Sequence, residues 1–147
     1  MFKRILIPTD GSKVADKAVK AGIRFAKEIG AKVVGYYAIE PVQAYYYSEG
    51  AMIDGRLIAE LERQAKATGE KTLAAMAKLA RAGRVRFDSL CDRPQTAYDG
   101  IAKAARRKKC DAIFMASHGR SGIAKLVMGS VTQKVLAQSK IPVVVYR

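Results

Sequence analysis

Length, composition and charge restrict the kind of protein this chain encodes. Its 147 residues suit a single domain spanning 1–147, and 50% hydrophobic with 27% charged residues is ordinary globular usage, which excludes disorder. No apolar run approaches the roughly 20 residues of a membrane span, and the start lacks a signal-peptide stretch, so we expect a cytoplasmic protein. The net charge of +14 leaves nucleic acid, an anionic membrane face, a phosphorylated ligand or a solvated surface open as explanations.

The first half of the chain alternates apolar runs with amphipathic stretches. Residues 3–8 predict a strand, and a helix follows with Ser12 as N-cap and Gly30 in a left-handed conformation at its end. Residues 31–38 predict a second strand, and 40–55 a loop. Residues 55–82 predict a long helix whose inward face begins at Leu57.

The second half continues the alternation. Residues 85–90 predict a third strand, and Pro94 suits the first position of a helix that ends in the basic run 106–109. A fourth strand at 112–115 is followed by a loop rich in glycine and serine. A helix over about 130–138 and a last strand over 141–146 complete the chain.

Alternating helices and nearly continuous apolar strands are typical of a parallel sheet that helices cover on both faces. The sequence therefore predicts a three-layer, doubly wound α/β sandwich, flavodoxin- or Rossmann-like, with a five-stranded parallel sheet. The pattern allows the strand order 2-1-3-4-5 or 3-2-1-4-5, and we take 3-2-1-4-5 as the expected order. Ligands of such folds bind beyond the carboxyl ends of the strands, where the strand order reverses. The loops to consider are therefore 9–12, 38–55, 91–94 and 116–130.

The loop after the fourth predicted strand has the composition of an anion site. Gly119 lies in it, and Gly129 precedes a helix start at Ser130, where backbone N–H groups can approach an anion closely. Arg120 and Lys125 add positive charge. The spacing fits neither a Walker A loop nor a dinucleotide-binding fingerprint. From the residues alone, a phosphate site and glycines that serve only turns are equally supported.

These residues resemble the universal stress protein family, and the resemblance covers essentially the whole chain. The nucleotide-binding branch carries Gly-x2-Gly-x9-Gly-Ser/Thr after strand four, which Ala116, Gly119, Gly129 and Ser130 match here. The segments 5–12 and 139–145 also look like that family. Three matched segments in the right order make the resemblance specific.

The resemblance implies a site for ATP, with or without Mg²⁺, and no metal ligand from the protein. The cofactor-binding residues it implies are Pro8, Thr9, Asp10, Ala38, Met115, Ala116, His118, Gly119, Arg120, Gly129, Ser130 and Val131. Asp10 and the backbone near Ala38 would face the nucleoside, and the glycines would hold the ribose and phosphates. It also implies a homodimer through the last strand, which begins at Ile141 and ends at Tyr146.

Three of these residues have an alternative interpretation. Ala116 replaces the first glycine of the signature: a required positive φ would make alanine about 1 kcal/mol unfavourable, whereas a requirement for small size would accept it. Asp10 is either a ligand-binding carboxylate or an Asx-turn residue beside Ser12. His118, the only histidine, is more typical of an exposed loop residue than of a ligand contact or a catalytic base.

Cysteine and tyrosine residues suggest no catalytic site. Cys91 and Cys110 fall at opposite edges of the predicted sheet, about 15 Å or more apart, so we expect two free thiols and no zinc site. The tyrosines at 36, 37 and 45–47 suit either a base-stacking platform or partly buried structure.

We therefore predict a stress-response protein that binds ATP and acts in sensing or signalling. It would be at most a slow ATPase or self-phosphorylating protein, with Ser130 or Thr132 as acceptor and no catalytic residue otherwise assigned. The alternative is a dimeric interaction module that has lost nucleotide binding. A basic nucleic-acid-binding protein is third, because the run 106–109 ends a helix and no base-reading motif occurs, so specific nucleic-acid binding is not expected.

Overall fold

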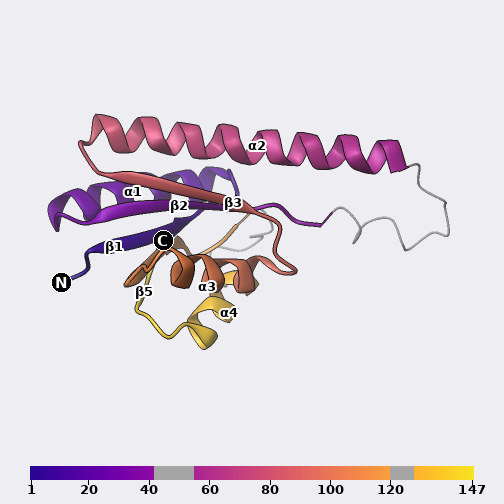
Figure 1. Ribbon diagram of the computed structural model, residues 1–147. Coiled ribbons are helices and arrows are strands. Elements are labelled where there is room, and N and C mark those ends of the chain that lie inside the picture. Colours follow the sequence, from indigo (N-terminus) through magenta and orange to yellow (C-terminus); the bar gives the residue numbers. More distant parts are fainter. Residues whose placement is uncertain (42–54, 120–127) are drawn as a thin grey trace.

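The computed structural model describes residues 1–41, 55–119 and 128–147, and it confirms the predicted architecture (Figure 1). Five parallel strands form one sheet in the order β3-β2-β1-β4-β5. The strands are β1 (Arg4–Pro8), β2 (Lys32–Ala38), β3 (Phe87–Asp92), β4 (Ala112–Ala116) and β5 (Val143–Tyr146). We call the side of the sheet where all strands begin the amino edge, and the opposite side, where they end, the carboxyl edge.

Helices cover both faces of the sheet because each buries one apolar stripe. The helices are α1 (Lys13–Glu28), α2 (Gly55–Ala82), α3 (Ala97–Arg107) and α4 (Ser130–Gln138). α1 and α2 pack on one face, where Val19 and Leu73 share a core with Ile7. α3 and α4 pack on the other face, where Ile101 and Val135 meet the opposite side of β1 and β4.

Local signals at α1 are confirmed. The Ser12 hydroxyl accepts the Ala15 N–H at 3.2 Å, as an N-cap does, and Gly30 has a φ of +71° just beyond the helix. Gly22 permits the close packing of α1 on the sheet, because a Cβ there would lie 2.7 Å from Ile7 Cδ1 and 2.9 Å from Phe114 Cδ1.

Two predicted helix details are wrong. α3 begins at Ala97 and not at Pro94, because Thr96 is its N-cap and accepts the Asp99 N–H at 3.4 Å. On α2, Leu57 is 47% exposed, and the buried face starts only at Gly69. In Figure 1 the beginning of α2 extends past the carboxyl edge, so its first turns have no sheet to cover.

β3 and β5, the two outermost strands of the sheet, each begin two residues later than predicted. Val85 donates its N–H to Ala80 O at 2.8 Å and so belongs to the turn that ends α2, and pairing with β2 starts at Phe87. β5 starts at Val143 because Pro142 has no N–H to give to a ladder, and the Ile141 N–H is taken by the Ser139 hydroxyl at 3.2 Å.

Candidate functional site

The loop after β1 supplies the first part of the site. Thr9 is buried, and its hydroxyl accepts the Gly11 N–H at 3.1 Å. Asp10 Oδ1 accepts the Ser12 N–H at 2.9 Å, which is an Asx turn, and Gly11 completes it with a φ of +74°. The turn-forming role of Asp10 is therefore confirmed, and it holds the carboxylate at the carboxyl edge.

Asp10 and Gly119 bring the loops after β1 and β4 into contact. A Cβ at Gly119 would lie 2.7 Å from Asp10 Oδ2, closer than real Cβ atoms approach. The φ of Gly119 lies outside the left-handed region, so its backbone conformation alone would accept alanine. What requires glycine at this position is the neighbouring carboxylate.

Gly129 lies against the backbone of the same loop. Its N–H donates to Ser117 O at 2.8 Å, and a Cβ there would lie 3.3 Å from His118 Cα. α4 begins at the next residue, Ser130, with Gly129 as its N-cap; no side chain caps it, and no acidic residue stands in its first turn. The first-turn N–H groups and the positive end of the helix dipole therefore lie beside the loop that contains Gly119.

Ala116 is an ordinary strand residue at the end of β4. It is buried and pairs with Tyr146 in the sheet, and among the described non-glycine residues only Arg84 and Lys109 have positive φ. Its carbonyl oxygen accepts the Thr132 hydroxyl at 3.0 Å, which ties β4 to α4. Small size is therefore what this position requires, and positive φ is not.

The remaining predicted residues of the phosphate side differ in accessibility. Met115 is 5% exposed and Val131 is half-buried, and both side chains pack into the core beneath α3 and α4. Met115 therefore offers a ligand no side-chain surface, whereas Val131 keeps part of its side chain accessible. Ser130 is exposed. Arg120 and Lys125 lie outside the described residues.

A pocket adjoins the nucleoside side of the predicted site. Pro8 and Ala38 end β1 and β2 and are both half-buried. A cavity of about 200 Å³ opens beside Ala38, and its lining residues are Ala38, Glu40, Pro41, Pro94, Gln95, Thr96 and Ala97. The sequence pointed to Ala38 and to the loop 91–94, whereas the lining residues 95–97 were assigned to the helix and not to the site.

His118 is more constrained than a loop residue in solvent. Its Nδ1 and the Ser117 hydroxyl are 2.8 Å apart and share a hydrogen bond. Its Nε2 is buried, and no atom of the described residues hydrogen-bonds it. The ring is half-buried, so the prediction of an exposed residue is wrong. An unpaired buried ring nitrogen beside Gly129 is a polar group that a ligand could satisfy.

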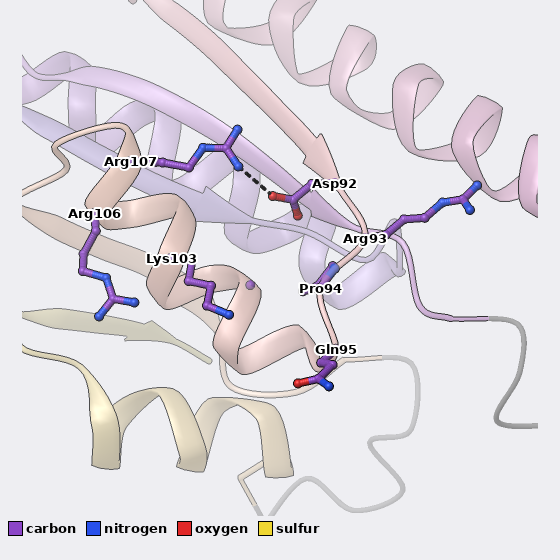
Figure 2. A pocket seen from close by; sticks show the side chains of 8 residues that line it. Asp92, Arg93, Pro94, Gln95, Lys103, Arg106 and Arg107 are labelled. Carbon is purple, nitrogen blue, oxygen red and sulfur yellow. Dashed lines mark hydrogen bonds and ion pairs between the residues drawn. The ribbon is translucent and has the colours of Figure 1, made fainter.

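A larger cavity, of about 500 Å³, lies between the end of β3 and α3 and shares Pro94 and Gln95 with the smaller one (Figure 2). Its lining residues are Asp92, Arg93, Pro94, Gln95, Gly100, Lys103, Arg106 and Arg107. Figure 2 shows Arg107 reaching toward Asp92, at 3.4 Å, while Arg93 turns toward α2, where it pairs with Glu62 at 2.7 Å. The cations at 103, 106 and 107 lie along one side of α3, the only signal of this cavity in the sequence.

The tyrosines at the end of β2 are structural. Tyr36 is 1% exposed and Tyr37 6%, so neither offers a face for base stacking. The Tyr36 hydroxyl donates to Asp92 Oδ1 at 2.7 Å, and burial, then this hydrogen bond, raises the pKa of Tyr36 above its ordinary range. Residues 45–47 of the predicted stacking platform lie outside the described residues.

The cysteines are free, as predicted. Cys91 lies in β3 near the carboxyl edge, and Cys110 precedes β4 at the amino edge. Burial raises the pKa of Cys110 to about 11. Within residues 1–41, 55–119 and 128–147, no cluster of three His, Cys, Asp or Glu side chains could hold a metal, and no helix is long and apolar enough to cross a bilayer.

Comparison with known proteins decides the family. The model of the Universal stress protein family matches residues 1–147. The chain belongs to the universal stress protein family. It is 33% identical, over the full length of both chains, to the universal stress protein in the QAH/OAS sulfhydrylase 3′ region of Thermus aquaticus. It is 32% identical to universal stress protein MJ0531 of Methanocaldococcus jannaschii, covering all of this chain and 83% of the relative.

Solved structures share the fold of this universal stress protein. That of protein MJ0577 has a TM-score of 0.82 and 24% identity, over 99% of this chain and 95% of the other. A universal stress protein in complex with cAMP has a TM-score of 0.72 and 22% identity, over 99% and 97% of the two chains. One from Archaeoglobus fulgidus in complex with dAMP has a TM-score of 0.64 and 18% identity, over 99% and 98%.

Proposed function

We propose that the chain binds an adenine nucleotide at the carboxyl edge, between the loops after β1 and β4. The observation that carries this proposal is the meeting of three parts: the Asp10 carboxylate, the Gly119 backbone against which it lies, and the uncapped α4 N-terminus that follows Gly129. A carboxylate suits the hydroxyls of a ribose, and free N–H groups at a helix start suit a phosphate. The cAMP and dAMP complexes of structural neighbours support adenine as the base.

Each residue then has a defined task. Asp10 Oδ1 accepts the Ser12 N–H in the Asx turn, and the carboxylate, whose Oδ2 lies beside Gly119, would contact the ribose. The cavity beside Ala38 would bind the base, and the backbone N–H groups of Ser130 and Val131 would bind the phosphates. A Cβ at Gly119 would lie 2.7 Å from Asp10 Oδ2, and one at Gly129 would lie 3.3 Å from His118 Cα, so glycine at both positions keeps backbone N–H groups accessible at close approach, as a phosphate requires.

ATP, with Mg²⁺ to neutralise its phosphates, is the ligand that we propose for a signalling role. Thr132 is 3% exposed and donates its hydroxyl to Ala116 O, so it is unsuited to self-phosphorylation, and Ser130 is the exposed hydroxyl of this helix start. We propose that the chain acts as one domain over 1–147 and in the cytoplasm, and that nucleotide occupancy alters its surface for a partner.

We also propose a homodimer through β5. β5 is the outermost strand of the sheet and pairs with β4 on one side. Its four residues Val143–Tyr146 are apolar yet only half-buried. An unpaired apolar edge strand is a template for a second strand, and a two-fold axis would cover it. Light scattering should give twice the mass of one chain at micromolar concentration, and a monomer there would refute the dimer.

The nucleotide proposal is tested by denaturing the purified protein, identifying any released nucleotide, and then measuring thermal stability with ATP and Mg²⁺. A ligand at 100 times its Kd stabilises by about 2.7 kcal/mol. Gly129→Asp should abolish the shift, because its side chain would meet the backbone of His118 and carry negative charge to the phosphate side. If no nucleotide is released and millimolar ATP does not raise the melting temperature, the proposal is refuted. The alternative function, a dimeric interaction module without nucleotide binding, would then stand.

A further inference from the structure

Three helices end at the amino edge in the same turn. After α1, α2 and α3, one residue has positive φ and the next donates its N–H to a carbonyl five residues earlier, in each case at 2.8 Å. The positive-φ residues are Gly30 (+71°), Arg84 (+57°) and Lys109 (+52°). This is the helix C-terminal turn that glycine ordinarily occupies. Two of the three positions carry a long cation in its place.

Neither cation has a packing reason to be there. Arg84 and Lys109 are exposed, and among the described residues neither side chain makes a hydrogen bond or an ion pair. The left-handed conformation is unfavourable for a residue with a Cβ, and glycine at the equivalent position after α1 shows that this fold accepts glycine in the turn. Such outliers are retained where they serve a function, so their shared charge is the feature to explain.

The amino edge between these turns is also basic. The Lys32 N–H donates to Lys3 O at 2.9 Å, and the Val33 N–H donates to Arg86 O at 2.9 Å, so Lys3, Lys32 and Arg86 stand on three neighbouring strands. Neighbouring strands are about 4.8 Å apart. We call Lys3, Lys32, Arg84, Arg86 and Lys109 the basic row.

The acidic groups at this edge have other partners or lie at its margin. Asp111 accepts the backbone N–H groups of Lys3 and Arg4 at 2.8 and 3.0 Å, and Asp88 pairs with Lys108 at 3.0 Å. Glu28 is exposed in the last turn of α1. The hydrogen bond from Lys108 lowers the pKa of Asp88, and the positive charge of Lys32 lowers it by a smaller amount. Backbone N–H groups leave the charge of Asp111 in place, so Asp111 and Glu28 oppose the five cations of the basic row, and the edge keeps a net positive charge.

Helix dipoles do not account for that charge. Each helix C-terminus carries the equivalent of about half a negative charge, and the effect is confined to the last turn. Lys27, Arg81, Arg106 and Arg107 already occupy the last turns of the three helices. The basic row is additional to them and is spread across the width of the sheet.

We propose that the amino edge binds the sugar–phosphate backbone of duplex nucleic acid without reading its sequence. A row of cations, four of them exposed and Lys32 half-buried, matches a row of phosphates, whereas a small anion would use only one or two of them. The aromatic residues beside the row, Phe2 and Phe87, are half-buried and pack against the core, so the described residues of this edge offer no open ring on which single-stranded bases could stack. Duplex backbone is the partner that this basic surface fits.

The surface is separate from the proposed nucleotide site. Strands of 4 to 7 residues lie between the two edges, which places them roughly 13–23 Å apart at about 3.3 Å per residue. That exceeds the Debye length of about 8 Å at physiological salt. Duplex binding should therefore persist with ATP and Mg²⁺ present, and it does not depend on whether the nucleotide proposal holds.

Fluorescence anisotropy with two labelled 24-base-pair duplexes of unrelated sequence tests the proposal. If the basic row neutralises about five phosphates, log Kd should change with log salt with a slope near 4.5, and affinity should fall about 500-fold from 50 to 200 mM salt. The two duplexes should bind alike, and ATP with Mg²⁺ should not displace them. Different affinities for the two sequences, or displacement by ATP, would overturn the proposal.

Charge variants locate the surface. Arg84→Gln with Lys109→Gln should lower the salt slope by about 1.8, whereas Lys17→Gln with Lys20→Gln, an equal charge change on the exposed face of α1, should leave it unchanged. Equal effects of the two pairs would overturn the proposal. So would tighter binding to vesicles of phosphatidylserine and phosphatidylcholine than to either duplex, because a membrane surface would then be the partner.

Glycine at the same two positions separates function from folding. Arg84→Gly with Lys109→Gly removes both charges and relieves both left-handed residues, so this variant should melt at a higher temperature yet bind duplex more weakly. A variant that melts higher and binds duplex as the parent does would overturn the proposal.

Discussion

Gly119→Ala is the change that tests the proposed nucleotide site most directly. The new methyl would lie 2.7 Å from Asp10 Oδ2, so the carboxylate must move by several tenths of an ångström to reach ordinary contact. The φ of Gly119 is not in the left-handed region, so the backbone should tolerate alanine and the free energy of unfolding should change by less than about 1 kcal/mol. We expect ATP affinity to fall about tenfold or more, since 1.4 kcal/mol corresponds to a factor of ten.

The assay is calorimetric titration with ATP and Mg²⁺, with Gly55→Ala as the matched control. A Cβ at Gly55 would meet nothing within 4 Å, so this variant should bind ATP as the parent does. Asp10→Ala completes a double-mutant cycle, because a methyl that acts by displacing the carboxylate has nothing to displace in that background. Wild-type affinity in Gly119→Ala, or an equal loss on adding it to Asp10→Ala, would refute the reasoning.

Three further predictions concern the core. Gly100→Ala should lower the free energy of unfolding by about 1–3 kcal/mol in a urea titration, with Gly55→Ala as control, because its Cβ would collide with the Tyr36 hydroxyl. Tyr36→Phe should lower it by about 1 kcal/mol, since Asp92 Oδ1 loses a donor at 2.7 Å; an unchanged urea midpoint would contradict this. The pKa of Cys110 is about 11 in the folded protein against 9.0 when unperturbed, because the buried thiol resists ionisation. The stability that the neutral thiol contributes is therefore complete below pH 9, and the free energy of unfolding should decline as the pH rises from 9 to 11. Thermal melts over that range should show a shallower decline in Cys110→Ala than in the parent.

Prediction was most accurate where a local pattern is enough to specify structure. The apolar strands and the amphipathic stretches predicted a parallel sheet with helices on both faces, because burial on two faces leaves few arrangements of such a pattern, and the observed strand order is one of the two that this pattern allowed. Ser12 and Gly30 were placed correctly because a cap depends on the nearest few residues. Pro94 was misplaced because α3 is capped by Thr96 and begins only at Ala97.

The candidate site shows the same division. The sequence singled out Asp10, Gly119 and Gly129 by residue type and spacing, and it left the role of Ala116 undecided. The structure decided that role by placing Ala116 within β4 without positive φ, and it set Asp10 against Gly119. No spacing rule predicts that contact, because residues 109 positions apart meet only through the pairing of β1 with β4.

The sequence by itself therefore determined the fold class through its periodicity, the family through three matched segments, and the residue types of the candidate phosphate loop through local chemistry. Only the tertiary structure decided which side chains meet. It buried Tyr36 against Asp92, left Nε2 of His118 unpaired among the described residues, and gathered Lys3, Arg84 and the rest of the basic row at one edge. Part of the positive charge thus has a location that composition cannot give, since parallel strands bring distant cations to one edge.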